Sequence, residues 1–347
     1  MVASRPASEP IPLTSGHPTT DFSIVVPSFN QGNFIGNTLD SLLQQEYPRL
    51  EILVMDGGST DETVDVLRTY GDRIRWVSEP DEGQSDALQK GFSLATHEWL
   101  GWLNSDDIQV NRALFHVDRA VRANPNADVV VGQGHYMNKA GEYQRPYPTI
   151  AVGPDVDVCH ELFTKGYVAQ PSVFFRRSVY ERAGGVDRNL QFAMDYDLWV
   201  RLARVGSTFV GVETDISGNR WYAETKTTTA TLPLLADVVA VQIRDYGRVS
   251  PFIVQAISDY LYQTIHANHS GDTHHLVYRT AYFKSLWFAL NFRSPLYCAR
   301  GLLRQQIAKS GPVVGDELSM NELAKAVVKL VHSRGGKFLS SLIKQES

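Results

Sequence analysis

The fold is decided by FSIVVPSFN at residues 22–30 and by EILVMDGGST at residues 51–60, two apolar runs that each end in a polar turn. Between them, apolar residues recur at helical spacing: Phe34, Ile35, Leu39, Leu42 and Leu43. Short apolar runs separated by amphipathic segments are typical of β-α-β units. The pattern therefore predicts buried strands at 22–27 and 51–55, joined by a helix, in a mainly parallel sheet.

The same alternation continues along the first half of the chain. A helix is expected after the second strand, with Ser59 or Thr60 as its N-cap and Gly71 just past its end. Further strands are predicted at 74–78, 99–103 and 129–131, and further helices at 85–94 and 113–123. We therefore predict an α/β fold, with an open Rossmann-like sheet flanked by helices.

The pattern changes twice in the second half. After Gly132 it loosens into Gly-, Tyr- and Pro-rich sequence, and it tightens again at a strand (172–175) and a helix (195–204). Beyond residue 231 only helical periodicity remains, at 234–246, 251–266, 276–292 and 320–342. We therefore predict a loose Pro-rich tail at 1–20, an α/β domain at 21–230 and a helical C-terminal extension at 231–347.

Composition narrows the class of protein. The chain has 347 residues, of which 43% are hydrophobic, and its formal net charge is −5. An acidic chain of this kind is not expected to bind nucleic acid, because proteins that follow a phosphate backbone usually carry a basic stripe. The two cysteines form no C-x-x-C pair, and no stretch is expected to act as a secretory signal or to span a membrane. These features favour a cytoplasmic location.

The C-terminal extension contains two basic amphipathic segments. Their cationic residues are Arg293, Arg300, Arg304 and Lys309 in one, and Lys325, Lys329, Arg334 and Lys337 in the other. Segments of this type can rest on anionic membranes, which would place the protein peripherally at the inner face of a membrane. Packing against the α/β domain, or dimerisation, accounts for them equally well.

Polar residues follow four of the predicted strands at the point where each strand ends. They are Pro27 to Asn30, Asp56 to Ser59, Glu79 to Asp81, and Asn104 to Asp107. Ligands of open α/β sheets bind beyond the carboxyl ends of the strands. We therefore expect the four turns to meet along one rim of the sheet.

The fourth turn, Asn104-Ser105-Asp106-Asp107, follows the buried run WLGWL directly. Carboxylates crowded at a sheet edge repel one another and resist burial, and a hard divalent cation such as Mg²⁺ or Mn²⁺ would relieve both effects. Taken alone, the turn is better explained as a solvated helix start, since acidic residues favour helix N-termini.

The ordered set of motifs resembles glycosyltransferase family 2 with its GT-A fold. The resemblance runs from residue 22 to about 227 through FSIVVPSFN, EILVMDGGSTDET, SEPDEGQSDALQKG, WLGWLNSDDI, QPSVFFRRSVYERAGGVD and AMDYDLWVRLA. It implies a metal-dependent transferase of the hexosyltransferase type that uses a nucleotide-sugar donor.

The resemblance also implies which residues bind the donor. The positions that match the family's nucleotide-sugar-binding residues are Pro27, Ser28, Asn30, Asp56, Asp81, Asn104, Ser105, Asp106, Arg220 and Lys226. Asp106 matches the metal ligand of the D-x-D motif, for which Mn²⁺ or Mg²⁺ is implied. Asn104 departs from the motif's usual first aspartate, and Tyr222 stands where a histidine often provides a further metal ligand.

Asp195 matches the family's catalytic base, and Met194 replaces the preceding glutamate. From the residues alone, Asp195 is better explained as a helix cap, and Asp197 as the structural partner of Arg201 one turn later. The resemblance places Gln170 near the acceptor, and Trp221 is expected to contact ligand. Three other tryptophans, Trp99, Trp102 and Trp199, are expected to pack in the core.

The leading hypothesis is an inverting transferase that moves a sugar to a saccharide or lipid-linked saccharide in cell-surface polysaccharide or glycoconjugate synthesis. A nucleotidyltransferase is less consistent, because Ser28 to Gln31 lack a basic, Gly-rich phosphate loop. A dinucleotide-dependent oxidoreductase fails because Gly57 and Gly58 are not part of G-x-G-x-x-G. A sugar-nucleotide-binding protein without transferase activity is the non-enzyme alternative, and the presence of both Asp106 and Asp195 argues against it.

Overall fold

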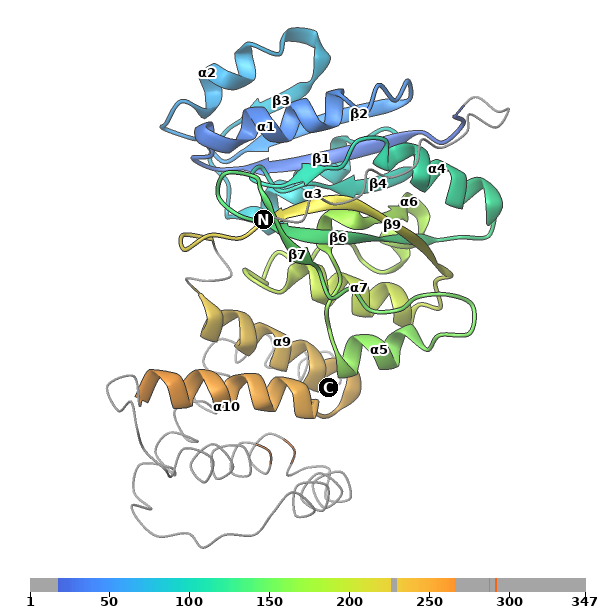
Figure 1. Cartoon of the computed structure of the whole chain (residues 1–347), viewed down its shortest axis with the longest axis vertical. Helices are drawn as coiled ribbons and strands as arrows, with labels where there is room; N and C mark the ends of the chain where they lie inside the picture. The colour runs from blue at the N-terminus through green and yellow to red at the C-terminus, as the bar shows by residue number, and fades with distance from the viewer. Residues whose placement is uncertain (1–17, 226–229, 266–286, 288–290, 292–347) are drawn as a thin grey trace, which may run out of the picture.

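The computed structural model describes residues 18–225, 230–265, 287 and 291, shown in colour in Figure 1. Nine strands form one sheet within these residues: β1 Phe22–Ser28, β2 Leu50–Asp56, β3 Arg75–Ser78, β4 Trp99–Trp102, β5 Ile108–Gln109, β6 Val129–Met137, β7 Tyr143–Pro146, β8 Val173–Arg176 and β9 Phe209–Arg220. The α-helices are α1 Gly32–Leu43, α2 Thr63–Arg68, α3 Gln84–Leu94, α4 Ala113–Ala123, α5 Val158–Thr164, α6 Arg177–Arg182, α7 Met194–Arg204, α9 Thr231–Tyr246 and α10 Pro251–Ile265. Two short 3₁₀ helices, η1 Gly71–Arg73 and η2 Gln170–Ser172, precede β3 and β8.

The sheet is mixed, and its order is β3-β2-β1-β4-β8-β6-β9-β5, with β7 paired to β6. Strands β3, β2, β1 and β4 are parallel, whereas β8 runs antiparallel to both β4 and β6. Ser28 pairs with Asp56, which in turn pairs with Ser78. The carboxyl ends of β1 to β3 therefore lie level with one another, as the predicted α/β fold requires.

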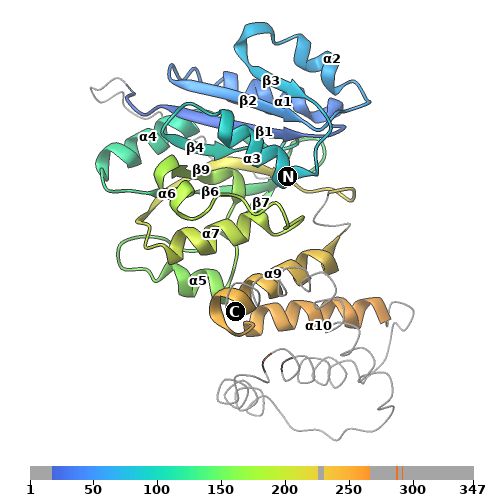
Figure 2. The ribbon, with the colours of Figure 1, turned by 180° about the vertical axis from the view of Figure 1, so that it is seen from behind.

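Helices cover both faces of the sheet, as predicted. On β1, Ile24 and Val26 pack in a cluster that includes residues of α1 and α4, whereas Val25 belongs to a second cluster with α3 and α7. Figure 2 shows α3, α6 and α7 on the face turned away from the viewer in Figure 1. Trp99, Trp102 and Trp199 are each 2% exposed, which confirms the prediction that they belong to the core.

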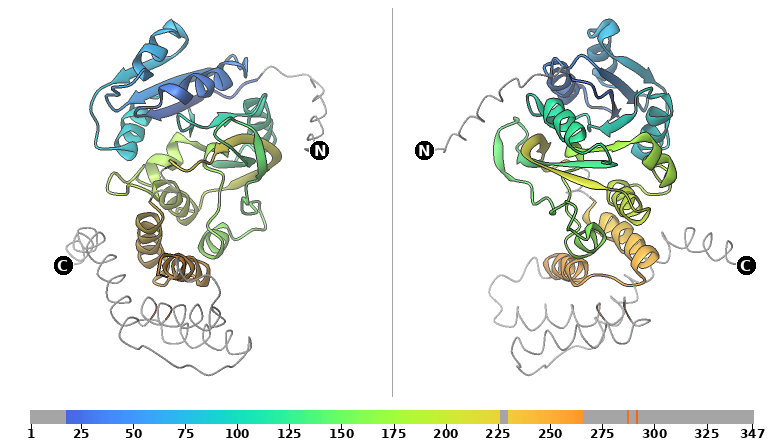
Figure 3. Two further views of the ribbon diagram at one scale, coloured as in Figure 1. Left: turned by 60° about the vertical axis from the view of Figure 1, so that its left-hand side comes forward. Right: turned by 90° about the vertical axis from the view of Figure 1, so that its right-hand side faces the viewer.

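The predicted helices at 234–246 and 251–266 are present as α9 and α10, which pack side by side below the sheet (Figures 1 and 3). Except for residues 287 and 291, the helices predicted at 276–292 and 320–342 lie outside the described residues, as do their basic clusters. No helix in the described segments combines the length and apolarity that a membrane crossing needs.

Residues 1–17 of the predicted tail also lie outside the described residues. The backbone amides of Thr19 and Thr20, at the end of the tail, donate hydrogen bonds of 3.2 and 3.1 Å to the Asp118 carboxylate. This contact holds the chain against α4 just before β1 begins.

The prediction was wrong about the region after Gly132. Strand β6 continues to Met137, β7 follows it as a hairpin, and β9 forms a 12-residue strand beside β6. The sequence pattern missed β9 because several of its polar side chains are buried with partners, where polar residues usually face solvent. Asp215 is 2.9 Å from the His135 imidazole, and the Ser217 hydroxyl is 2.6 Å from that of Ser172.

The expected N-cap of α2 was also wrong, because this helix begins only at Thr63. The Ser59 hydroxyl instead donates to Asp56, and the Thr60 amide donates to the side chain of Asn30. The Asp61 carboxylate accepts the amide and hydroxyl of Thr63, the first residue of α2, and the N-cap residue Glu62 makes no side-chain capping bond. Contacts to the ends of β1 and β2 have displaced the helix start.

Two helix glycines give a matched test of the packing. A Cβ atom on Gly91 of α3 would lie 2.4 Å from Val25 Cγ1, whereas one on Gly36 of α1 would make only ordinary contacts, the nearest at 3.7 Å. We expect Gly91→Ala to lower the free energy of unfolding by about 1–3 kcal/mol through overpacking. Gly36→Ala should raise it by about 0.5–1 kcal/mol. Chemical denaturation of both variants checks this, and equal effects would contradict the close α3–β1 contact.

Candidate active site

A cavity of about 680 Å³ opens at the carboxyl edge of the parallel strands. Residues from the turns after β1, β2, β3 and β4 line it together with residues at the start of α7 and the end of β9. The predicted site residues that line it are Pro27, Ser28, Asp81, Asn104, Ser105, Asp106, Gln170, Asp195, Arg220 and Trp221. The fold therefore brings together residues that are up to 194 positions apart in the chain, from Pro27 to Trp221.

Three predicted donor-binding residues are not among those that line the cavity. Asn30 is exposed, and its side chain holds the Thr60 amide. Asp56 is 2% exposed and accepts hydrogen bonds from Ser59 and from the Ser78 hydroxyl, so it anchors the turn after β2. Lys226 lies outside the described residues. The nucleotide-binding roles of these three residues stay predictions.

The acidic turn after β4 is fixed by the most deeply buried of its carboxylates. Asp107 accepts a 2.7 Å hydrogen bond from the Arg220 backbone amide and a 3.1 Å one from the Asn104 side chain. The Thr38 hydroxyl also donates to the backbone carbonyls of Ser105 and Asp107. Burial, followed by the neighbouring charge of Asp106, raises the pKa of Asp107 well above its usual range.

Asp106 has a different environment, although its carboxylate is also largely enclosed. The Tyr222 hydroxyl donates a 3.2 Å hydrogen bond to its Oδ2 atom. Burial raises the pKa of Asp106, and the contact with Tyr222 and the charge of Arg220 act in the opposite direction. An ionised Asp106 is therefore costly in the ligand-free protein, and a cation beside it would stabilise the charged form.

The donor set fits a divalent cation that is only partly held by protein. Within the described part of the chain, no group of three His, Cys, Asp or Glu side chains is placed to hold a metal ion. Asp107 already uses its carboxylate on Arg220 and Asn104, which leaves Asp106 as the carboxylate of this turn that could hold a cation. Mg²⁺ is commonly held by one or two carboxylates together with water and substrate phosphates. One aspartate and a diphosphate are thus a sufficient set.

Arg220, predicted to face the donor diphosphate, is only 6% exposed at the end of β9. Its Nε atom donates to the backbone carbonyl of Asp106 at 2.6 Å, and Nη1 donates to that of Lys139 at 2.7 Å. The guanidinium also lies over the Phe34 ring, 5.0 Å from its centroid. Arg220 therefore ties the acidic turn to the β6–β7 connection and adds positive charge to the cavity wall.

Asp195 lies in the first turn of α7, where helix amides favour an anion. Its Oδ1 atom accepts a 2.7 Å hydrogen bond from the Tyr196 amide. Burial raises the pKa of Tyr147 well above its usual range, and the charges of Tyr136 and then Asp195 add to the effect. Asp195 therefore faces a wall that includes this tyrosine.

Sequence reasoning missed Tyr136 and Tyr147 as cavity residues, because their segment was interpreted as a loose one. The two rings are stacked, with their centroids 4.7 Å apart. The Trp221 ring contacts the Tyr136 ring edge-on, with a centroid distance of 5.5 Å. Trp221 is 44% exposed at the cavity wall, a suitable place for a sugar-contacting ring. Residues 129–137 show no alternation of apolar and polar side chains, so the sequence pattern gave no signal for Tyr136.

The fold and the cavity define the class of protein: this is the GT-A fold of nucleotide-diphospho-sugar transferases, with the acidic turn at its expected edge. The family model for glycosyl transferase family 2 matches residues 23–184. This matched region, close to half of the chain, is a glycosyltransferase family 2 region.

Relatives and solved structures agree with this assignment. An uncharacterised glycosyltransferase of Rickettsia prowazekii is 28% identical over 218 residues, which cover 59% of this chain and 66% of the relative. A PGL/p-HBAD biosynthesis glycosyltransferase of Mycobacterium tuberculosis is 27% identical over 185 residues, covering 52% and 68%. The structure of S. aureus TarS residues 1–349 shares the fold, with a TM-score of 0.53 and 13% identity over 86% of this chain and 94% of TarS.

The raised pKa of Asp106 predicts a pH-dependent cost. Because its folded-state pKa lies above the unfolded value, the ionised carboxylate destabilises the metal-free fold at neutral pH, and this penalty disappears as protonation proceeds at lower pH. We expect Asp106→Asn to raise the melting temperature in metal-free buffer at pH 8, with a gain that shrinks on acidification. Asp72→Asn, at an exposed site outside the cavity, should show no such trend. A gain in melting temperature that is constant across pH would contradict the raised pKa of Asp106.

Proposed function

We propose that this chain is a metal-dependent, inverting glycosyltransferase. It moves a sugar from a nucleotide-diphosphate donor to a saccharide or lipid-linked saccharide, in the synthesis of cell-surface polysaccharide or glycoconjugate. The observation that carries the proposal is that Asp106 and Asp195, from turns 89 residues apart, line the same cavity. One carboxylate suits the cation of a diphosphate, and the other suits the proton of an acceptor hydroxyl.

In the proposed reaction, the acceptor oxygen attacks the anomeric carbon of the donor sugar. The Asp195 carboxylate takes the hydroxyl proton as the new bond forms, a contribution of about 10²- to 10⁴-fold in rate. The bond from the anomeric carbon to the diphosphate breaks, and its electron pair leaves with the diphosphate. Attack from the opposite side inverts the configuration at that carbon.

The leaving diphosphate needs positive charge near the β4 turn. A divalent cation, Mn²⁺ or Mg²⁺, held by Asp106 and the phosphate oxygens, would supply it. Arg220 contributes a fixed positive charge on the same wall, and its bonds to backbone carbonyls prevent it from moving during the reaction. Gln170 and Trp221 are assigned to the acceptor side, and Pro27, Ser28 and Asp81 to the donor side.

Several finer assignments belong to the same proposal. S. aureus TarS residues 1–349, which shares the fold, has been solved in complex with UDP, and this supports a nucleotide-containing donor for the present chain. We place the protein in the cytoplasm, with peripheral contact at the inner face of a membrane through its C-terminal segments. This location suits a lipid-linked acceptor, and we expect no nucleic-acid partner.

Replacing the proposed base separates catalysis from binding. We expect Asp195→Asn to lower the transfer rate by at least about 10²-fold, because the amide cannot accept the hydroxyl proton. Its affinity for nucleotide, measured by calorimetry, should stay near that of the unchanged protein. Asp72→Asn serves as the control for loss of a carboxylate away from the cavity. Transfer at a normal rate by Asp195→Asn would refute this role.

Metal removal distinguishes a transferase from a protein that only binds sugar nucleotides. Chelation should abolish both transfer and slow hydrolysis of the donor, and added Mn²⁺ should restore them. Asp106→Ala should need much higher Mn²⁺ for the same activity, because the only carboxylate ligand assigned to the cation is lost. A thermal-shift screen of nucleotide sugars with Mn²⁺ would identify the donor. Activity that is indifferent to chelation would contradict the cation's role.

A further inference from the structure

Helix α9 contacts the chain on both sides of Asp195. Upstream, the Asp237 carboxylate of α9 accepts a 3.1 Å hydrogen bond from the Phe192 backbone amide. Downstream, Gln242 donates a 3.0 Å bond to the Tyr196 hydroxyl, and Arg244 donates to the Asp197 carboxylate. One helix from beyond residue 230 therefore contacts both ends of a six-residue segment, 192–197, that contains the proposed base.

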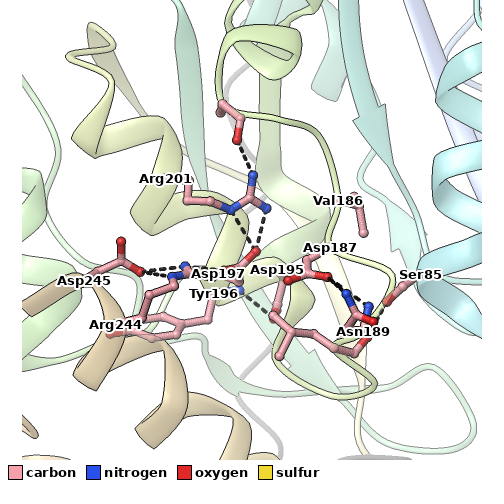
Figure 4. Close-up of polar contacts among 12 residues, drawn as sticks. Ser85, Val186, Asp187, Asn189, Asp195, Tyr196, Asp197, Arg201, Arg244 and Asp245 are labelled. Carbon is pink, nitrogen blue, oxygen red and sulfur yellow. Dashed lines mark hydrogen bonds and ion pairs between the residues drawn. The ribbon is translucent and has the colours of Figure 1, made fainter. Parts of the chain in front are cut away.

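Of these contacts, the one with Asp197 needs the most complete charge compensation, because this carboxylate is completely buried. Two guanidinium groups compensate its charge: Arg201 from its own helix and Arg244 from α9 (Figure 4). Arg244 is in turn paired with the neighbouring carboxylate of Asp245. Removing one partner of a buried ion pair is strongly unfavourable, so the charges hold α7 and α9 in a single arrangement.

Helix geometry explains how this contact bears on the base. Successive residues of an α-helix are rotated by roughly 100°, so Asp195 and Asp197 point in directions about 200° apart. Asp195 lines the cavity, and Asp197 is held by α9 on the far side of the same turn. Fixing Asp197 therefore fixes the rotation of α7, and with it the direction of the Asp195 carboxylate.

The approach to Asp195 is anchored on its other side by α3, near the turns assigned to the donor. The Ser85 hydroxyl donates a 2.6 Å hydrogen bond to the Leu190 carbonyl, and Asn189 folds back on Asp187 (Figure 4). The segment that leads into α7 thus spans from α3 to α9. A rigid base is useful here because an error of about 1 Å in position can cost on the order of 10²-fold in rate.

We propose that Asp237 and Arg244 of α9 are positioning residues for the transfer reaction, and that they act by orienting Asp195. The inference rests on the proposed function, in which Asp195 is the base. Neither residue lines the cavity, so they contact neither donor nor acceptor there. Helix α9 is accordingly a part of the catalytic unit.

The test compares arginines at the same helix junction. Arg244→Met removes the contact with Asp197, whereas Arg204→Met, the control, removes a half-exposed arginine of α7 that binds Asp245 but not Asp197. We expect Arg244→Met to lower kcat by about 10- to 100-fold, with the donor KM and the calorimetric affinity for nucleotide unchanged. Arg204→Met should keep kcat within about twofold. A purely structural role would instead reduce the folded fraction, measured by circular dichroism, while kcat per folded molecule would stay within about twofold.

A second set of variants keeps the inference falsifiable if Arg244→Met does not fold. Asp237→Ala removes the acceptor for the Phe192 amide at a half-buried position, and it should also lower kcat selectively. If Arg244 acts through Asp197, the effects of Asp197→Asn and Arg244→Met on kcat should not add in the double variant. Normal kcat in folded Arg244→Met, or in Asp237→Ala when Arg244→Met is unfolded, overturns the inference. Failure of the proposed function is distinct, because Asp195→Asn would then remain active.

Discussion

The site depends on a buried acid at the end of a strand. Asp107 follows the core strand β4 and is 5% exposed, so its carboxylate needs compensation from the protein itself. The backbone amide of Arg220 supplies it, and the Arg220 side chain binds the Asp106 carbonyl in return. This reciprocal contact joins the end of β9 to the end of β4. Asp106 lies directly before Asp107 in this joint. Its position is therefore set by the contacts that compensate the buried Asp107, and not by interactions of its own carboxylate.

The first half of the fold was predictable because its signals are local. Strands β1, β2 and β4 are apolar runs with polar turns behind them, and the helices between them show one apolar face. Strand β9 was not predictable in this way, because Asp215 and Ser217 are buried through partners far along the chain. The predicted start of α2 was wrong because the expected caps bind outside the helix: Ser59 binds Asp56, and Thr60 binds Asn30.

For the site, the sequence motifs predicted which residues take part, but not the contacts that surround each of them. The motifs indicated Asp106 and Asp195, and the tertiary structure alone places the two in one cavity. No motif indicates that the Arg220 guanidinium is committed to backbone carbonyls, because those carbonyls belong to a hairpin that the pattern did not predict. Tyr222 shows the same effect: only the fold reveals its hydroxyl on Asp106.

The composition changes near residue 230, after the last strand of the sheet. The ion pair between Asp197 and Arg244 joins the chain before this point to the chain after it. Removing one of the two partners of a fully buried carboxylate such as Asp197 is destabilising. The matched family region ends at residue 184, before α7 begins. The placement of the proposed base is therefore determined by chain beyond that region. Sequence differences in α9 can alter catalysis while the donor-binding edge of the sheet stays the same.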